Sequence, residues 1–99
     1  MMEKIVRDGK VAVAVSIGFG AGWSTWTDVN CMDARFNQLF LDGKYDEAAA
    51  LCKELGLGYA GGADDVEIIW VPVGTEFQIT EYDGTESIEY KDDIAWEKA

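Results

Sequence analysis

The chain has 99 residues, of which 48% are hydrophobic and 27% are charged, and its formal net charge at pH 7 is −11. This size and balance predict one folded domain and exclude an intrinsically disordered chain. The negative charge argues against direct binding of nucleic acid or of an anionic membrane, because both would be repelled at long range.

The first predicted element is a β-hairpin over residues 5–16. The dipeptide Asp-Gly at 8–9 is a turn signal between two apolar runs. Val11, Val13 and Val15 fall on one face of the second strand, and small residues alternate with them on the other. Because both faces are apolar or small, we expect a central strand that is covered on both sides.

A glycine-rich segment, Ser-Ile-Gly-Phe-Gly-Ala-Gly-Trp-Ser-Thr-Trp, follows at residues 16–26 and is called the first glycine loop. Glycines raise the entropy cost of ordering a backbone, so such a run indicates positive φ or close approach to the main chain. Bare N–H groups before a helix can hold an anion, and aromatic rings can stack a base. The alternative is a structural turn whose glycines let the rings pack down. The candidate ligand-binding residues here are Gly18, Phe19, Gly20, Gly22, Trp23, Ser24, Thr25 and Trp26.

Two helices are predicted next. The first spans residues 31–41, carries apolar side chains at helical spacing and would be capped by Asp28 or Asn30. The second spans residues 45–55 and ends at Gly56. The joint between them is short, so we expect an antiparallel pair.

A second glycine loop, residues 58–65, precedes three predicted strands at 66–71, 76–82 and 87–90. Both loops would lie at strand ends, so the second is expected beside the first. Ile94 and Trp96 would close the core or add an edge strand. The order ββ–αα–βββ predicts an α+β domain with one mostly antiparallel sheet and the helix pair on one face. The second loop adds the candidate ligand-binding residues Gly61, Gly62 and Asp64.

The residues do not favour catalysis. The chain has no histidine, so neither Cys31 nor Cys52 has its usual base, and the pattern of a serine hydrolase is missing. The first glycine loop lacks the lysine of a phosphate-binding P-loop. Adjacent carboxylates at Asp64 and Asp65 lack further ligands at the spacing of a metal loop. We therefore expect no enzyme activity, no cofactor and no metal.

Location in a reducing cytoplasm is expected. The first residues lack the character of a signal peptide, and no apolar run approaches membrane-spanning length. Both cysteines fall in predicted helical segments beside apolar neighbours, which is typical of free, buried thiols.

The negative charge is concentrated near the end of the chain, since residues 64–99 hold eleven acidic and two basic residues. One strand face rich in carboxylates would dock on a basic surface and imitate nucleic-acid phosphates. The alternative is the ordinary solvated side of an antiparallel sheet. The candidate protein-contact residues are Glu76, Gln78, Glu81, Asp83, Glu86 and Glu89.

Three segments, residues 10–26, 61–65 and 81–88, resemble small proteins of uncharacterised function that bacteriophages and prophages encode. The resemblance covers most of the chain and implies action in the cytoplasm of a bacterial host. Small phage proteins of this size often antagonise host defence, either by blocking an effector protein or by sequestering a nucleotide signal.

Our leading interpretation is a non-enzymatic phage-type accessory protein that binds a nucleotide-like or other small anionic ligand. Arg7, Lys10 or Arg35 would supply positive charge, in part across a homo-oligomer interface. The first alternative is an acidic inhibitor that docks on a basic, nucleic-acid-binding surface of a host protein. The second is a structural or assembly component of the phage, which would form a homo-oligomer.

Overall fold

The computed structural model describes residues 2–91. Within them, five strands and two helices follow in the predicted order, which confirms the α+β class. Ile94 and Trp96, predicted to close the core or form an edge strand, lie outside the described residues. The elements are β1 (Val6–Arg7), β2 (Lys10–Ser16), α1 (Ala34–Leu41), α2 (Tyr45–Glu54), a single 3₁₀ turn η1 (Ala63–Asp65), β3 (Val66–Pro72), β4 (Phe77–Tyr82) and β5 (Thr85–Tyr90).

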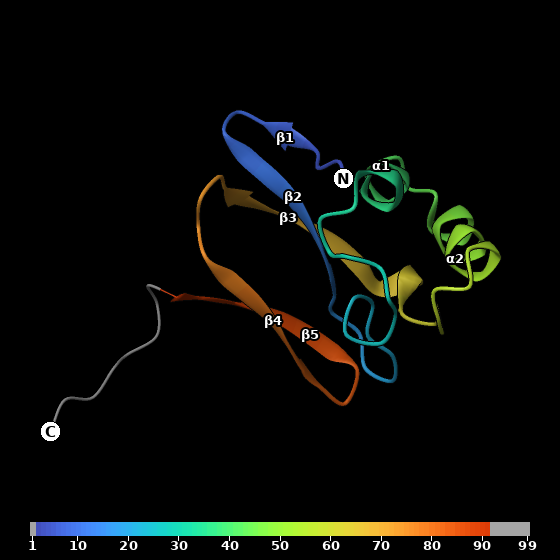
Figure 1. Cartoon of the computed structure of the whole chain (residues 1–99). Helices are drawn as coiled ribbons and strands as arrows, with labels where there is room; N and C mark the ends of the chain where they lie inside the picture. The colour runs from blue at the N-terminus through green and yellow to red at the C-terminus, as the bar shows by residue number, and fades with distance from the viewer. Residues whose placement is uncertain (1, 92–99) are drawn as a thin grey trace, which may run out of the picture.

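The strands divide into two antiparallel sheets where one was predicted. One sheet has the order β1-β2-β3, and the other is the β4–β5 hairpin (Figure 1). The two hairpin turns are the Asp-Gly dipeptides at 8–9 and 83–84, whose positive φ angles suit two-residue turns. The hairpin of β4 and β5 does not extend the sheet beside β3, because its apolar face packs across the valine face of β2.

Strand β2 lies at the centre of the domain, as its alternation predicts. Val13 and Val15 pack in one cluster with side chains of β3, β4 and β5. Ala14 points the other way, into a second cluster with Phe36 and Phe40 of α1 and with side chains of α2. The helices therefore cover one face of the three-stranded sheet and the β4–β5 hairpin covers the other (Figure 1).

Helix α1 begins at Ala34, three residues later than predicted, and neither Asp28 nor Asn30 caps it. Asp33 is the N-cap, and its carboxylate accepts from the backbone N–H of Arg35 at 2.9 Å. The segment before the helix is hydrogen-bonded to the sheet instead, because the Cys31 carbonyl accepts from the N–H of Ala14 in β2 at 2.8 Å. Cys31 consequently lies outside the helix, contrary to the prediction.

Helix α2 ends as the sequence predicts. Gly56 has φ +66°, and the N–H of Leu57 donates to the Cys52 carbonyl at 3.0 Å. Cys31 is half-buried and Cys52 is buried, and both are free thiols. Burial raises the pKa of both thiols, so they stay protonated at neutral pH and are poor nucleophiles.

Candidate functional site

The two glycine loops and the β4–β5 turn meet at the C-terminal end of β2 (Figure 1). The N–H of Gly20 donates to the carbonyl of Asp83 in the turn at 2.9 Å. Gly62 lies so close to the first loop that a β-carbon there would lie 2.7 Å from the Ala21 carbonyl oxygen and nearer still to that of Gly22. Segments that are far apart in the sequence therefore form one end of the molecule.

Three backbone N–H groups of the first glycine loop bind a carboxylate that belongs to the chain itself. The side chain of Glu86, on β5, is 1% exposed. Its Oε1 accepts from the N–H of Ser16 at 2.9 Å. Its Oε2 accepts from the N–H of Trp23 at 2.8 Å, from the N–H of Thr25 at 2.9 Å and from the hydroxyl of Thr25 at 2.6 Å. These four donors satisfy a buried charge that would otherwise be strongly destabilising.

Gly22 is needed for this arrangement because the loop closes tightly around the carboxylate. A β-carbon at this position would lie 2.5 Å from Oγ1 of Thr25, 2.7 Å from the Trp26 ring and 3.0 Å from Oε2 of Glu86. The sequence pattern of an anion-binding loop is thus matched by an anion-binding geometry. The anion it holds is Glu86, so the N–H groups of Trp23 and Thr25 are already occupied.

The predicted stacking role of Trp23 is wrong, because its ring is fully buried. The indole packs edge-on against Phe36 at 5.6 Å and Phe40 at 5.1 Å between ring centroids. Its Nε1 has no hydrogen-bond acceptor within residues 2–91. Trp23 is therefore part of the core beneath the loop, where large aromatic side chains contribute strongly to stability.

The other predicted ligand-binding residues divide between packed and exposed positions. Phe19 is 74% exposed and Trp26 is 41% exposed. The Trp26 ring lies 6.4 Å from that of Tyr59, and Tyr59 lies over Gly61. Ser24 is half-buried, Gly18 is half-buried and Gly20 and Asp64 are exposed.

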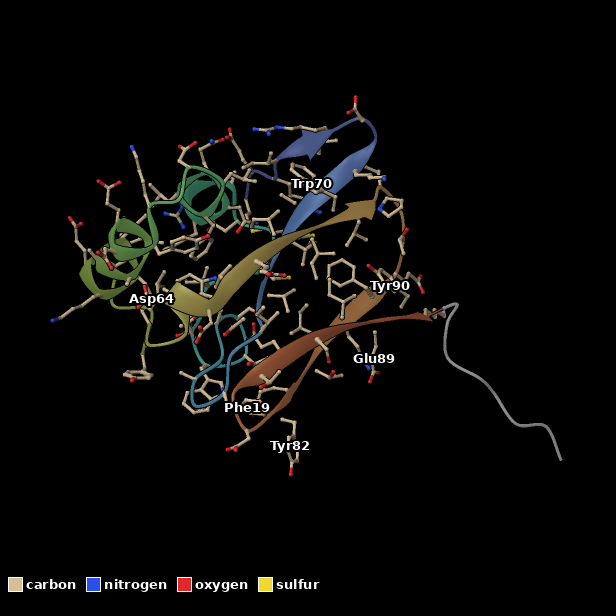
Figure 2. The ribbon with its side chains drawn as sticks, turned by 180° about the vertical axis from the view of Figure 1, so that it is seen from behind. Phe19, Asp64, Trp70, Tyr82, Glu89 and Tyr90 are labelled. Atoms are coloured by element: carbon tan, nitrogen blue, oxygen red, sulfur yellow. The ribbon has the colours of Figure 1, made fainter. Side chains whose placement is uncertain are left out.

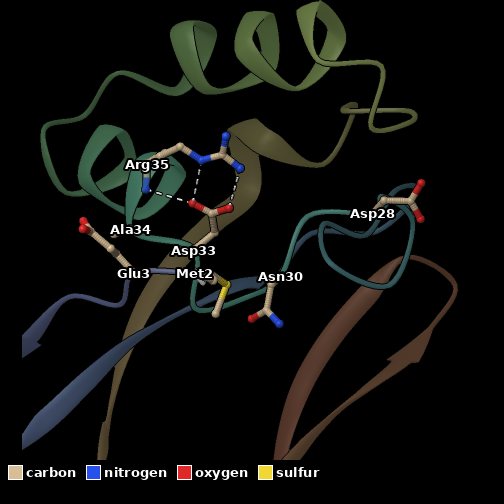
Figure 3. A pocket seen from close by; sticks show the side chains of 7 residues that line it. All are labelled: Met2, Glu3, Asp28, Asn30, Asp33, Ala34 and Arg35. Carbon is tan, nitrogen blue, oxygen red and sulfur yellow. Dashed lines mark hydrogen bonds and ion pairs between the residues drawn. The ribbon is translucent and has the colours of Figure 1, made fainter.

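The two arginines proposed to supply positive charge are already engaged. The guanidinium of Arg35 binds both oxygens of Asp33, at 3.2 and 2.9 Å, which raises the pKa of Arg35. Figure 3 shows this pair in the wall of an open hollow of about 550 Å³. The remaining charged groups that line it, Glu3 and Asp28, are acidic. Arg7 lies over the Trp70 ring at 5.5 Å.

The candidate protein-contact residues are exposed with one exception. Glu86 was expected on the surface and is buried, so it cannot meet a partner. Strand β5 begins at Thr85, two residues earlier than predicted, which places Glu86 on the same face as the inward-facing Ile88 and Tyr90. Of the others, Glu76 pairs with Lys91 at 2.7 Å, Gln78 bonds to Glu89 at 3.2 Å, Glu81 accepts from the Gly84 N–H at 2.9 Å, and Asp83 occupies the turn.

Comparison with known proteins found no matching family model, no significantly similar curated sequence and no significantly similar solved structure. Residues 2–91 contain no group of three or more His, Cys, Asp or Glu side chains placed to hold a metal ion. Across the same residues, neither helix has the length and apolar character needed to cross a membrane.

Proposed function

We propose that the protein is a non-enzymatic binding protein that docks on a basic surface of another protein. The observation that carries this proposal is the occupation of the first glycine loop by Glu86. The loop amides that converge on one anion position already bind this carboxylate, and the N–H of Gly20 donates to Asp83. By contrast, Asp65, Glu81 and Asp83 at the same end of the molecule are exposed. This favours a cationic partner over an anionic ligand.

The contact region we propose is the tip surface, defined as Phe19, Asp65, Glu81, Tyr82 and Asp83. All five residues are exposed. Within residues 2–91 none of the three carboxylates takes part in an ion pair. Aromatic side chains dominate the binding energy of many protein interfaces, and complementary charge speeds association.

The resemblance to phage-encoded proteins makes a protein of the bacterial host the expected partner. On a basic host surface that binds nucleic acid, the carboxylates of the tip surface would take the place of the phosphates. An assembly component of the phage, the other alternative, would form a stable homo-oligomer. A net charge of −11 on each copy opposes that association.

The test is capture of host proteins on the immobilised chain at low salt, followed by measurement of the affinity of each captured protein. We expect basic proteins, with an affinity that weakens about tenfold or more when salt rises from about 0.05 M to about 0.5 M. The variant Glu81→Gln with Asp83→Asn should lose the captured protein, because it removes two charges from the tip surface.

The chain offers a closely matched control. Asp8 occupies the other Asp-Gly turn with φ +50°, against +52° for Asp83, so Asp8→Asn with Glu54→Gln removes equal charge elsewhere. The control variant should bind as the wild type does. Equal loss in both variants would contradict a specific site. Thermal stabilisation by a nucleotide, with no protein captured, would support the anionic-ligand interpretation instead.

A further inference from the structure

Two exposed aromatic rings stand at the tip surface. Tyr82 is 80% exposed and Phe19 is 74% exposed, more than any other large apolar side chain within residues 2–91. Figure 2 shows both at the same end of the molecule. The first glycine loop carries Phe19, the β4–β5 hairpin carries Tyr82, and the two are bonded to each other. The Gly20 N–H donates to the Asp83 carbonyl at 2.9 Å, and the Thr85 hydroxyl donates to the Gly18 carbonyl at 3.2 Å.

The backbone that carries these rings is fixed by hydrogen bonds and packing against neighbouring segments. Glu86 ties β5 to the first glycine loop through four hydrogen bonds. Gly84, in the β4–β5 turn, packs directly on the backbone of Gly20 and Ala21. Binding would therefore order little additional chain, which lowers the entropy cost of using these rings as anchors.

The tip surface also carries three exposed carboxylates. Glu81 and Asp83 are the neighbours of Tyr82 in the sequence, and the Asp65 side chain lies against Gly18. An aromatic face beside a carboxylate suits a guanidinium group, which can stack on the ring and donate two parallel N–H bonds to the oxygens. An ammonium group lacks the planar fork that does both.

One of the chain's own arginines uses this combination. Arg35 binds both oxygens of Asp33 and lies 5.6 Å from the centroid of the Phe36 ring. We propose that the tip surface docks an arginine-bearing segment of the partner protein, with Phe19 and Tyr82 stacking guanidinium groups that the carboxylates bind. This inference rests on the proposed function and names the chemistry of the partner.

The test uses two synthetic peptides of equal length and charge, one alternating arginine with glycine and the other lysine with glycine. Binding is measured at low salt by calorimetry, and amide shifts are followed by NMR. We expect about fivefold tighter binding of the arginine peptide, and shifts centred on residues 18–20 and 81–84. The variant Phe19→Ser with Tyr82→Thr should abolish the preference.

Two other exposed apolar residues provide the control, because Leu55→Ser with Val73→Ser makes the same kind of apolar-to-polar change outside the tip. The control should keep the arginine preference. Equal affinity for the two peptides, or a preference that survives in the tip variant, would overturn this inference and leave the proposed function standing. If neither peptide binds, the result would count against this inference and against the proposed function. Concentration-dependent dimers lost only in the tip variant would show that a second copy is the occupant.

Discussion

Replacing Glu86 with glutamine is expected to lower the free energy of unfolding by about 3 kcal/mol. The glutamine amide has nearly the same shape, but one of its two terminal atoms is a donor that faces protein donors. If its oxygen keeps the contacts of Oε2 with Trp23 and Thr25, its nitrogen meets the N–H of Ser16. A buried donor is then left without an acceptor, and the remaining bonds lose their charge.

Urea unfolding followed by tryptophan fluorescence would measure the change, and about 3 kcal/mol corresponds to roughly 12–24 °C in Tm for a domain of this size. Glu89→Gln is the matched control on the same strand. Glu89 is exposed and bonds only to Gln78 in the described residues, so we expect a change within about 0.5 kcal/mol. Equal effects of the two substitutions would contradict the structural role of Glu86.

Gly84→Ala is expected to cost about 3 kcal/mol more than Gly74→Ala. Both glycines have φ +88°, so the backbone strain of an alanine, about 1 kcal/mol, is shared. At Gly74 a β-carbon meets no atom within 4 Å, whereas at Gly84 it would run into the backbone of Gly20 and Ala21. Those backbone atoms cannot move without disturbing the bond from Gly20 to Asp83.

The comparison separates the strain of a positive φ from packing, because the two positions share the same φ and differ in what a β-carbon would meet. Denaturant unfolding of the two alanine variants gives the difference directly. Similar stabilities would mean that the β4–β5 turn does not pack on the first glycine loop as described. That result would also remove the support we infer for the tip surface.

The fold could be predicted from the sequence where the signals are local. The Asp-Gly turn at 8–9, the alternation along residues 11–16 and the end of α2 at Gly56 each depend on neighbouring residues, and the structure confirms them. The division into two sheets could not be predicted in this way. It depends on β4 and β5 burying their apolar face against Val13 and Val15, which are distant in the sequence.

The candidate site was harder to predict because an anion-binding backbone does not reveal the origin of its anion. The glycines of residues 16–26 indicate close approach to N–H groups, and the structure places a carboxylate there. Glu86, which supplies it, lies 70 residues from Ser16. Extending the alternation of Ile88 and Tyr90 back by one step would have placed Glu86 on the buried face. No such pattern marks Trp23 as core, since exposed and buried aromatic rings share the loop.

The most direct test of the internal carboxylate is rescue of the Glu86→Ala variant by acetate. This substitution removes a CH₂–COO⁻ unit, which acetate matches in size and charge. We predict that acetate raises the Tm of Glu86→Ala above its value in chloride at the same ionic strength, and leaves the wild type and Glu89→Ala unchanged. A Glu86→Ala variant as stable as the wild type, or one that responds to acetate and chloride alike, would contradict the account.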